Sequence, residues 1–414
     1  MAGAPSQGPY RGIRVLDLSR VLAGPWAAQM LGDLGADVIK VERPGVGDDS
    51  RMFGPPFFKD REGRDTARSA MFQSANRNKR AITLNIAKPE GQALLKRLAA
   101  KADVLIENYK VGTLARYGLG YEDLKEINPG LIYCSITGYG QTGPYRDRGG
   151  YDPIVQAMSG MMSVTGYPDG DPGGGGPMKA GPSIVDMSAG IYAVVAIQAA
   201  LRERDQHGGA GQAIDIGLLD VGVALMGQFG LHYLASGVSP GRIGTQANGG
   251  APGGGFSCAD GYIMIAPGSQ ALYETFCHAL DRPELASDPR FLTNSLRLRN
   301  RPELMRLLDE TIGRLPVAEV HRRMVAAGIP SSPVNDMAQV LADAQVRHRG
   351  IALEVEHPVT GSMPLIGNPI KASGPLLAPT RAPPEVSEDT RAILGDELGL
   401  SQQEIDDLYR DGIA

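Results

Sequence analysis

The chain has 414 residues, and its 41 Lys and Arg against 46 Asp and Glu leave a formal net charge of −5. With 42% hydrophobic and 21% charged residues, the composition excludes a disordered chain, a coiled coil and a nucleic-acid binder that relies on bulk positive charge. The length predicts two or three domains. The three cysteines, Cys134, Cys258 and Cys277, lie far apart. We therefore expect no disulfide framework, no metal site and a cytoplasmic location.

No targeting or membrane segment is expected. The first ten residues, MAGAPSQGPY, have neither the basic start nor the apolar centre of a secretory signal. The apolar stretches have the length of core elements, and none reaches the roughly 18 residues of a membrane span. We therefore expect no membrane partner.

Short apolar strands alternate with helical patterns in the first part of the chain. A strand at 13–18, a helix at 25–34 that begins with Pro25, and a strand at 37–42 form the first unit. The same rhythm continues with strands at 81–86, 103–107 and 131–137 and helices at 89–101 and 121–128. This alternation predicts an α/β fold with a Rossmann-like, doubly wound parallel sheet.

The pattern changes after residue 150. A Gly/Pro loop at 168–182 leads into a long helix at 184–204, and a strand within 209–216 precedes a second long helix at 217–236. A Gly-rich run at 249–255, a hairpin turning at Asp260–Gly261 and helices near 299–314 and 316–327 follow. The expected organisation is a large α/β domain (1–205), a linker helix region (206–236), a small α+β domain (237–330) and a tail (331–414).

Two known sequence motifs occur in the chain without the secondary structure that each of them requires. Gly138-Tyr-Gly140-Gln-Thr-Gly143 spells GxGxxG, but no helix opens at its third glycine to meet a pyrophosphate, so we expect no NAD. Glu42, at the end of the second strand, is then interpreted as a surface charge. Gly237-Val-Ser239-Pro-Gly241 spells GxSxG, but a helix precedes the serine and a proline follows it, which argues against a hydrolase.

Cationic residues gather where the strands are predicted to end. Residues 76–80 (NRNKR) hold three cations, Arg43 ends the second strand, and Arg116 follows Asn108 and Tyr109. The carboxyl ends of the strands form the ligand crevice of a doubly wound sheet, and arginine suits polyphosphate. Both a phosphate site and a solvated charged surface fit this pattern.

Ser183-Ile-Val-Asp186 fits a capping box at the start of the long helix. In one interpretation Asp186 only supports the helix N-terminus. In the other, helix-terminal amides keep a reactive carboxylate ionised beside a flexible glycine loop. The glycine run at 249–255 is in the same way either a lid or a plain connection.

These segments together resemble the class III CoA-transferase family, which includes formyl-CoA transferase. The resemblance covers nearly the whole chain and rests on long ordered runs rather than on one short motif. The matching runs are 20–25, 31–51, 102–124, 133–144, 150–160, 181–201, 211–220, 328–337 and 354–361.

The resemblance implies a set of site residues. The family's nucleophilic aspartate corresponds to Asp186. Its CoA contacts correspond to Arg20, Leu22 and Ala23 in the run 20–25, and to Arg43, Lys79, Asn108, Tyr109, Arg116 and Tyr139. Its glycine loop corresponds to the run that holds Gly253, Gly254 and Gly255. The resemblance also implies a tail that returns to the large domain and a homodimer of two interlocked chains. Coenzyme A, as acyl-CoA, is then the substrate, and no metal is needed.

Departures from the pattern bear on the reaction. Racemases of this fold carry His-Asp where this chain has Tyr151-Asp152, so a transferase is favoured over a 2-methylacyl-CoA racemase. Leu22 replaces the glutamine of formyl-CoA transferase, which argues against formate chemistry. The runs GDDSR, IENY and YCSITGYGQTGP are most similar to members that move CoA from succinyl-CoA to dicarboxylic acids. A non-catalytic acyl-CoA-binding protein is a further alternative.

The implied mechanism is covalent. Asp186 attacks the donor thioester, and an anhydride and then an aspartyl-CoA thioester form on it. A dicarboxylate acceptor needs a cation for its distal carboxylate, and Arg51 is our candidate. The rival interpretation is a structural ion pair of Arg51 with Asp48 or Asp49.

Overall fold

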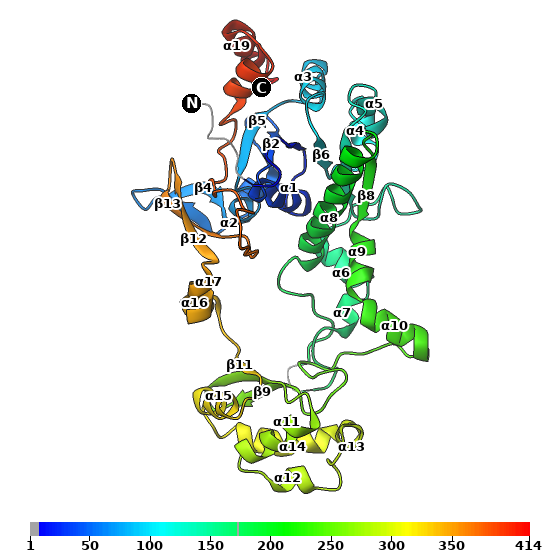
Figure 1. The fold of residues 1–414 in the computed structure, drawn as a ribbon, viewed down its shortest axis with the longest axis vertical. Helices are drawn as coiled ribbons and strands as arrows, with labels where there is room; N and C mark the ends of the chain where they lie inside the picture. Colours follow the sequence, from blue (N-terminus) through cyan, green and yellow to red (C-terminus); the bar gives the residue numbers. More distant parts are fainter. Residues whose placement is uncertain (1–7, 172–173) are drawn as a thin grey trace. The chain divides into compact units, whose positions relative to one another are not determined.

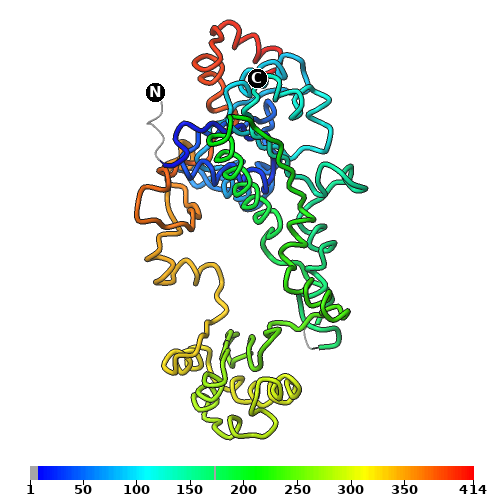
Figure 2. Tube along the Cα trace, turned by 45° about the vertical axis from the view of Figure 1, so that its right-hand side comes forward, coloured from blue at the N-terminus to red at the C-terminus, as the bar shows by residue number. Residues whose placement is uncertain are grey.

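The computed structural model describes residues 8–171 and 174–414, so two residues of the predicted 168–182 loop and the first seven residues of the chain lie outside the described part. The described chain forms two compact units. Unit one holds residues 8–161, 179–234 and 349–414, and unit two holds residues 162–171, 174–178 and 235–348. Figures 1 and 2 colour both units along the sequence.

Unit one is built on a six-stranded, all-parallel sheet with the order β5-β2-β1-β6-β7-β8. Numbered in chain order within the sheet, this is 3-2-1-4-5-6, the order of the dinucleotide-binding folds. The strands are β1 (Arg14–Asp17), β2 (Asp37–Glu42), β5 (Lys79–Thr83), β6 (Val104–Glu107), β7 (Ile132–Thr137) and β8 (Ala213–Gly217). The predicted α/β class and parallel sheet are confirmed, with the third strand starting two residues earlier than expected.

Hydrophobic clusters cover both faces of the sheet. Adjacent residues of β1 divide between the clusters, because side chains alternate along a strand: Val15 joins one and Leu16 the other. On the Val15 face, helices α1 (Ala23–Asp33) and α8 (Ile184–Gln206) pack closely. A Cβ at Gly190 of α8 would lie 2.8 Å from the carbonyl oxygen of Ala23, so glycine is required there.

The Leu16 face is covered by helices from the N-terminal part and from the C-terminal part of the chain. Helix α3 (Pro89–Ala99) packs there together with the C-terminal residues Ile393, Leu394 and Ile405. The amide of Asn85 donates to the carbonyl of Ile413, which ties the tail to the end of β5. Figures 1 and 2 show this tail beside α3. The remaining elements of unit one are η1 (Asp49–Met52), β3 (Phe57–Lys59), β4 (Asp65–Ser69), α2 (Ala70–Ser74), α4 (Thr113–Arg116), α5 (Tyr121–Lys125), α6 (Asp152–Met158), α9 (Leu218–Leu225), β12 (Ala352–His357), β13 (Gly361–Ile366), α18 (Thr390–Ala392), η2 (Ile393–Glu397) and α19 (Gln402–Arg410).

The second long helix predicted at 217–236 is two helices. Helix α9 ends at Leu225, and α10 (Gly227–Ser236) follows at a bend of 68°. Gly227 begins α10 directly after the break, and glycine is a weak helix former. The apolar pattern continues through the bend, and periodicity alone therefore could not reveal it.

The expectation about apolar stretches was wrong in one respect. Helix α8 has 23 residues, and an 18-residue stretch of it has a mean hydropathy of 1.7, so it is long and apolar enough to cross a membrane by length and composition. The bent pair α9 and α10 passes the same test together. In α8, 44% of that stretch is buried within the protein. A core helix of a globular domain passes this test too, and α8 packs in the core beside α1.

Unit two is an α+β unit with its own core. Its antiparallel sheet contains β9 (Gly254–Cys258), β10 (Gly261–Ile265) and β11 (Ser331–Pro333), with the predicted hairpin between β9 and β10. Phe256, Ile263 and Phe276 lie in its core. Its helices are α7 (Met161–Val164), α11 (Gln270–Ala279), α12 (Glu284–Ser287), α13 (Asn294–Arg299), α14 (Arg301–Ile312), α15 (Val317–Ala326), α16 (Met337–Ala342) and α17 (Ala344–Arg349).

Candidate active site

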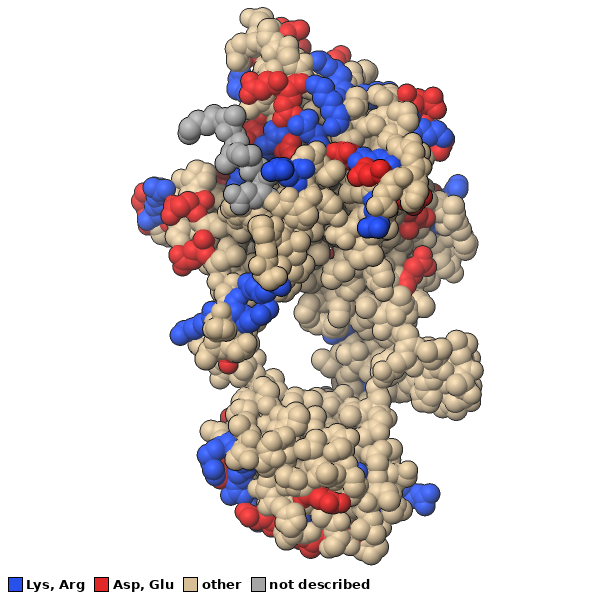
Figure 3. Space-filling model, in the orientation of Figure 1, with Lys and Arg blue, Asp and Glu red and all other residues tan. Residues whose placement is uncertain are grey.

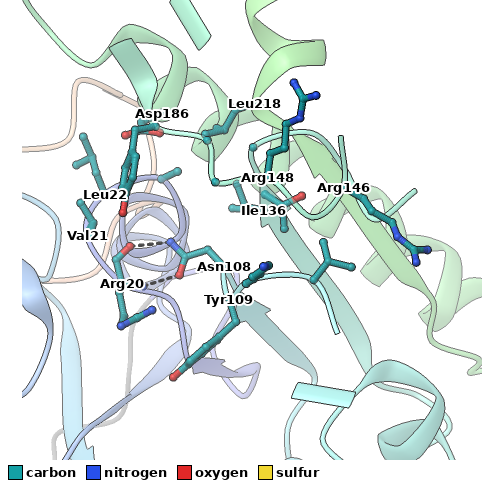
Figure 4. Close-up of a pocket in the computed structure, with 18 of the residues that line it drawn as sticks. Arg20, Val21, Leu22, Asn108, Tyr109, Ile136, Arg146, Arg148, Asp186 and Leu218 are labelled. Atoms are coloured by element: carbon teal, nitrogen blue, oxygen red, sulfur yellow. Dashed lines mark hydrogen bonds between the residues drawn. The ribbon is translucent and has the colours of Figure 1, made fainter. Parts of the chain in front are cut away.

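A cavity of about 290 Å³ lies at the carboxyl ends of the central strands of unit one (Figure 4). It is lined after β1 by residues 20–23 and after β6 by residues 108–111. These two neighbouring strands are where the chain order of the sheet reverses, which is the place where open α/β sheets bind ligands. Residues 136–138 at the end of β7, together with Asp186 and Leu218, complete much of the wall.

The loop after β1 is held by side chains from three other segments. Asn108 brackets Arg20: the amide of Arg20 donates to Oδ1 of Asn108 at 2.8 Å, and Nδ2 of Asn108 donates to the carbonyl of Arg20 at 2.7 Å. The amide of Val21 donates to Asp48, and Nζ of Lys40 donates to the carbonyl of Ser19. Val21 has a φ of 70°, a strained value for a β-branched residue. These bonds hold the loop backbone at the cavity in a conformation it would not adopt alone.

A buried ionic cluster lies beneath this loop. Lys40 of β2 contacts Asp48 at 2.8 Å and Asp17 at 3.8 Å, and all three side chains are fully buried. Burial alone would lower the pKa of Lys40, but the carboxylates of Asp48, Asp17 and Glu42 outweigh it and raise that pKa. The pKa of Asp48 is lowered, because the attraction of Lys40 exceeds the effect of burial. Both groups are therefore held in their charged forms.

Four cationic residues are among those that line the cavity. Arg20, Lys110, Arg146 and Arg148 all line the cavity. The guanidinium of Arg20 lies 5.0 Å from the ring centre of Tyr109 and binds Asp49 at 3.0 Å. In Figure 4 Arg146 extends away from Asp186, on the far side of the cavity. Such a set of cations suits a ligand with several anionic groups.

The structure brings together only some of the residues expected from the sequence. Asp186, Arg20, Leu22, Ala23, Asn108 and Tyr109 all line this cavity. Arg43 does not line it but reaches it indirectly, because Arg43 and Arg20 bind the two oxygens of Asp49. Arg116, at the end of α4, is exposed and is not among the residues that line the cavity, and Tyr139 packs edge-on against Tyr145.

Lys79 and Arg51 lie elsewhere than expected. Nζ of Lys79 is buried and donates to Asp17, Asn76 and the carbonyl of Pro25, so it has no free hydrogen for a phosphate. Burial lowers its pKa to about 8, although Asp17 opposes the change.

Arg51 forms a forked pair with Glu42 at 2.7 and 2.8 Å and stacks on Phe72. The rival interpretation of Arg51, an ion pair with Asp48 or Asp49, was wrong in its partner. The interpretation of Glu42 as a surface charge was also wrong, since Glu42 is only 5% exposed. The guanidinium that we assigned to a distal carboxylate is thus already paired.

The other cations of the run 76–80 are also paired. Arg77 is 4% exposed and binds Asp33, and Arg80 binds Asp37 and Glu397. The phosphate-site interpretation and the solvated-surface interpretation of this run are therefore both replaced by ion pairs with α1, β2 and η2.

The expected glycine loop belongs to unit two. Gly254 and Gly255 lie in strand β9, paired with Ile265 and Met264, and Gly253 lines a separate cavity beside α13. The preceding residues are held in place, because Arg297 donates to the carbonyl of Ala251 and Arg301 donates to those of Ala247 and Gly250.

Asp186 is the third residue of α8, but the capping box predicted for it does not form. Ser183 makes no side-chain capping bond. The free amides of Val185 and Asp186 instead donate to Oδ2 of Asp152, at 2.8 and 3.2 Å. Burial, and after it the negative charge of Asp152, raise the pKa of Asp186 to about 7. The expectation that helix amides keep Asp186 ionised was therefore wrong, because another carboxylate occupies them.

Two glycines bring Asp152 to this place. A Cβ on Gly138 would lie 2.6 Å from Cα of Gly150, so both ends of the 138–150 loop must be glycine for the backbones to meet. This contact returns the chain to the end of β7, directly before Tyr151 and Asp152. The first glycine of the GxGxxG run thus serves a close backbone contact and not a phosphate.

Sequence reasoning missed Asp152 as a site residue: it named the pair Tyr151-Asp152 only because Tyr151 departs from the His-Asp of racemases. Lys110, Arg146 and Arg148 were missed as well, although Arg146 and Arg148 stand in a glycine-flanked loop after a strand, a position where binding residues are common. Within the described residues, no group of three or more His, Cys, Asp or Glu is arranged to hold a metal ion.

A half-buried carboxylate and several cationic residues that line one cavity at the switch point of a parallel sheet are typical of an α/β enzyme that acts on an anionic substrate. CoA-transferase family III matches residues 10–390. The chain is 41% identical over 408 residues to the succinyl-CoA:glutarate CoA-transferase of Mus musculus, covering 99% of this chain and 91% of that protein. It is 42% identical over 388 residues to the succinate–glutarate CoA-transferase of Agrobacterium fabrum, covering 94% and 95%. The crystal structure of a CAIB/BAIF family protein from Brucella suis matches with a TM-score of 0.84 at 43% identity, covering 94% of this chain and 99% of that chain. The chain belongs to CoA-transferase family III and is a CoA-transferase, as the sequence predicts.

Proposed function

We propose that this enzyme transfers CoA from succinyl-CoA to a short dicarboxylic acid such as glutarate, with Asp186 as the covalent nucleophile. The observation that carries the proposal is the position of Asp186, a half-buried carboxylate in a cavity that four cationic side chains also line. The two relatives named for succinyl-CoA or succinate and glutarate, each about two-fifths identical over nearly the whole chain, support the choice of substrates.

The chemistry follows from a carboxylate that attacks acyl groups. The Asp186 carboxylate attacks the thioester carbon of the donor, which expels CoA thiolate and leaves a mixed anhydride. The thiolate then attacks the aspartyl carbonyl, which releases the donor acid and leaves an aspartyl-CoA thioester. The acceptor carboxylate repeats these two steps in reverse. Every intermediate is an activated acyl group, so the thioester's reactivity is conserved through the cycle.

The groups around Asp186 fit these steps. The loop after β1, fixed by Asn108 and Lys40, offers ordered backbone beside the reacting carboxylate. Tyr109 and Arg20 stack at the cavity wall and suit the flat, anionic nucleotide part of CoA. With Arg51 paired to Glu42, the cations available for a second carboxylate of the acceptor are those that line the cavity.

A substrate panel tests the choice of donor and acceptor. With succinyl-CoA as donor, we expect the highest kcat/KM for five- and six-carbon dicarboxylates and a much lower value for their monocarboxylate counterparts. The measurement is mass spectrometry of the acyl-CoA products. Equal rates for glutarate and butyrate would contradict a dicarboxylate acceptor. A racemase would instead exchange the α-proton of a 2-methylacyl-CoA with deuterium from the solvent.

We propose a homodimer as the working form. Large apolar side chains are exposed on helices of unit one: Ile191, Tyr192 and Val195 on α8, and Leu231 and Leu234 on α10. The side of α10 visible in Figure 3 carries no Lys, Arg, Asp or Glu. Exposed apolar surface of this kind is typical of subunit interfaces.

Sedimentation equilibrium tests the dimer. We expect a mass twice that of the 43.8 kDa chain at micromolar concentration. Leu231→Glu together with Leu234→Glu should shift the equilibrium toward single chains, because burying two carboxylates in an apolar contact is unfavourable. The paired change Gln402→Glu and Gln403→Glu, on the exposed side of α19, is the control. A parent protein that sediments as a single chain would contradict the proposal.

The cytoplasmic location also stays a proposal. Cys134 and Cys277 are buried, Cys258 is half-buried, and all three thiols are free. Free thiols suit a reducing compartment.

A further inference from the structure

The carboxylate of Asp152 contacts the start of α8, and the proposed function gives this group no role. Its side chain is 4% exposed, and every polar contact that it makes is directed toward the nucleophile's helix or toward α6. Oδ2 accepts from the amides of Val185 and Asp186, and Oδ1 accepts from Nε2 of Gln156 at 2.5 Å.

Gln156 extends this arrangement to the loop before α8. It lies one turn after Asp152 on α6, is fully buried, and its Oε1 accepts from the amide of Ala180 at 2.8 Å. Asp152 and Gln156 therefore fix both the first turn of α8 and the backbone that leads into it. The backbone amide of Asp186 is itself one of the groups that bind Asp152, so the position of the Asp186 Cα is fixed.

We propose that Asp152 is a positioning residue for the reaction: it occupies the free amides at the start of α8 and so holds Asp186 toward the cavity as a carboxylate with no amide donor of its own within the described residues. A carboxylate stabilised by helix amides would be a weaker nucleophile. With those amides taken, and with a second negative charge beside it, Asp186 is a less stable and more basic anion. The proposal rests on the proposed role of Asp186 as the nucleophile.

Few other charges act on Asp186 from the packed elements. Helix α1 carries Asp33, which is paired with Arg77, and β8 carries Asp215, which accepts from the amide of Gln141. Strand β7 carries the neutral groups Tyr133 and Cys134, and α9 carries the exposed Asp220. Among the cavity cations, Arg20 is paired with Asp49. Asp152 is the charge that acts on the pKa of Asp186 beside the effect of burial.

Two substitutions separate the charge of Asp152 from its geometry. Asp152→Asn keeps an oxygen for the amides but removes the charge, and we expect the acid limb of the kcat/KM profile to move down by roughly one pH unit. Asp152→Glu keeps the charge but moves it by one methylene, and we expect a tenfold or greater fall in kcat, an acid limb as in the parent and an unchanged KM for succinyl-CoA.

Asp220→Asn is the matched control, because Asp220 also lies in the first turn of a helix near the cavity but is exposed. We expect no movement of its acid limb. Burial also raises the pKa of Glu107 to about 7, so its titration could produce an acid limb of the kcat/KM profile in the same pH range. An acid limb that is due to Glu107 would not move in Asp152→Asn. An unmoved limb in Asp152→Asn would therefore overturn the proposal.

The same measurements distinguish this proposal from the proposed function. If Asp186→Asn still transfers CoA, the assigned nucleophile is wrong and the positioning role goes with it. If Asp186→Asn is inactive while Asp152→Asn keeps the parent's acid limb, the positioning role alone is wrong. Should Asp152→Asn fail to fold, as judged by circular dichroism, Asp152→Glu decides: a parental kcat would overturn the proposal.

Discussion

Asp186→Asn should abolish CoA transfer, with kcat lowered by at least four orders of magnitude while the protein still binds succinyl-CoA. An amide nitrogen or oxygen cannot attack the thioester and return as a leaving group, so no covalent intermediate forms. Steady-state kinetics by mass spectrometry measures the loss. The parent should show ping-pong kinetics, and hydroxylamine added with succinyl-CoA alone should trap a hydroxamate at Asp186.

The same variant should not be destabilised. The pKa of Asp186 is raised in the folded protein to about 7, above the value of about 4 in an unfolded chain. Such a group lowers the stability of the fold as pH rises from about 4 through 7, because the folded state holds its proton longer. Asp186→Asn removes this effect. We therefore expect it to melt at or above the parent's temperature at pH 8, with the difference vanishing near pH 4.

A purely structural aspartate would behave in the opposite way. If Asp186 were a helix cap, Asp186→Asn would lower the melting temperature slightly at every pH above 5 and leave measurable turnover. A variant with near-parental kcat would exclude the covalent mechanism. Asp220→Asn serves as the control for a carboxylate lost from another helix start near the cavity.

Lys40→Met should cause the largest loss of stability among the single substitutions considered. It leaves Asp48 buried without the cation that it contacts at 2.8 Å, while Asp17 keeps its bond to Lys79. Removing one partner of a fully buried pair costs on the order of 3–5 kcal/mol in the free energy of unfolding. The measurement is urea unfolding followed by circular dichroism, with Lys125→Met, in an exposed pair with Glu122, as the control.

The pH dependence gives a second test of Lys40. The pKa of Asp48 is lowered in the fold, so its contribution to stability is present above about pH 4, the unfolded value, and is lost as the pH falls further. Lys40→Met removes the cause of that lowering and should flatten this acid-dependent loss. It should also raise the KM for succinyl-CoA, since the bond from Lys40 to the carbonyl of Ser19 fixes the loop at the cavity. A stability within 1 kcal/mol of the parent would contradict this account.

Much of the fold could be predicted because it is encoded in local patterns. Alternating apolar strands and amphipathic helices, with Pro25 opening α1, are enough to indicate a parallel α/β sheet. The break between α9 and α10 could not be predicted, because the apolar pattern runs on through Met226 and Gly227. Strand order is likewise not a local property.

The candidate nucleophile could be predicted from the sequence, but the groups around it could not. Asp186 stands in a long run that resembles one family, so its place could be assigned without coordinates. The group that controls it, Asp152, lies 34 positions earlier, and no spacing rule joins the two. Their contact exists because Gly138 and Gly150 let two backbones meet at the end of β7.

The sequence by itself determined the α/β class, the parallel sheet and the position of the candidate nucleophile, because periodicity and long matching runs are properties of the chain. Only the tertiary structure decided which charges face the ligand and which are buried. Asp17 and Lys40 are partners in the register of β1 and β2, and Lys79 joins them from β5. The sequence around a cation at a strand end is the same whether its side chain is exposed or buried. Which of the two holds depends on the residues of the neighbouring strand, and strand order is set by the tertiary structure.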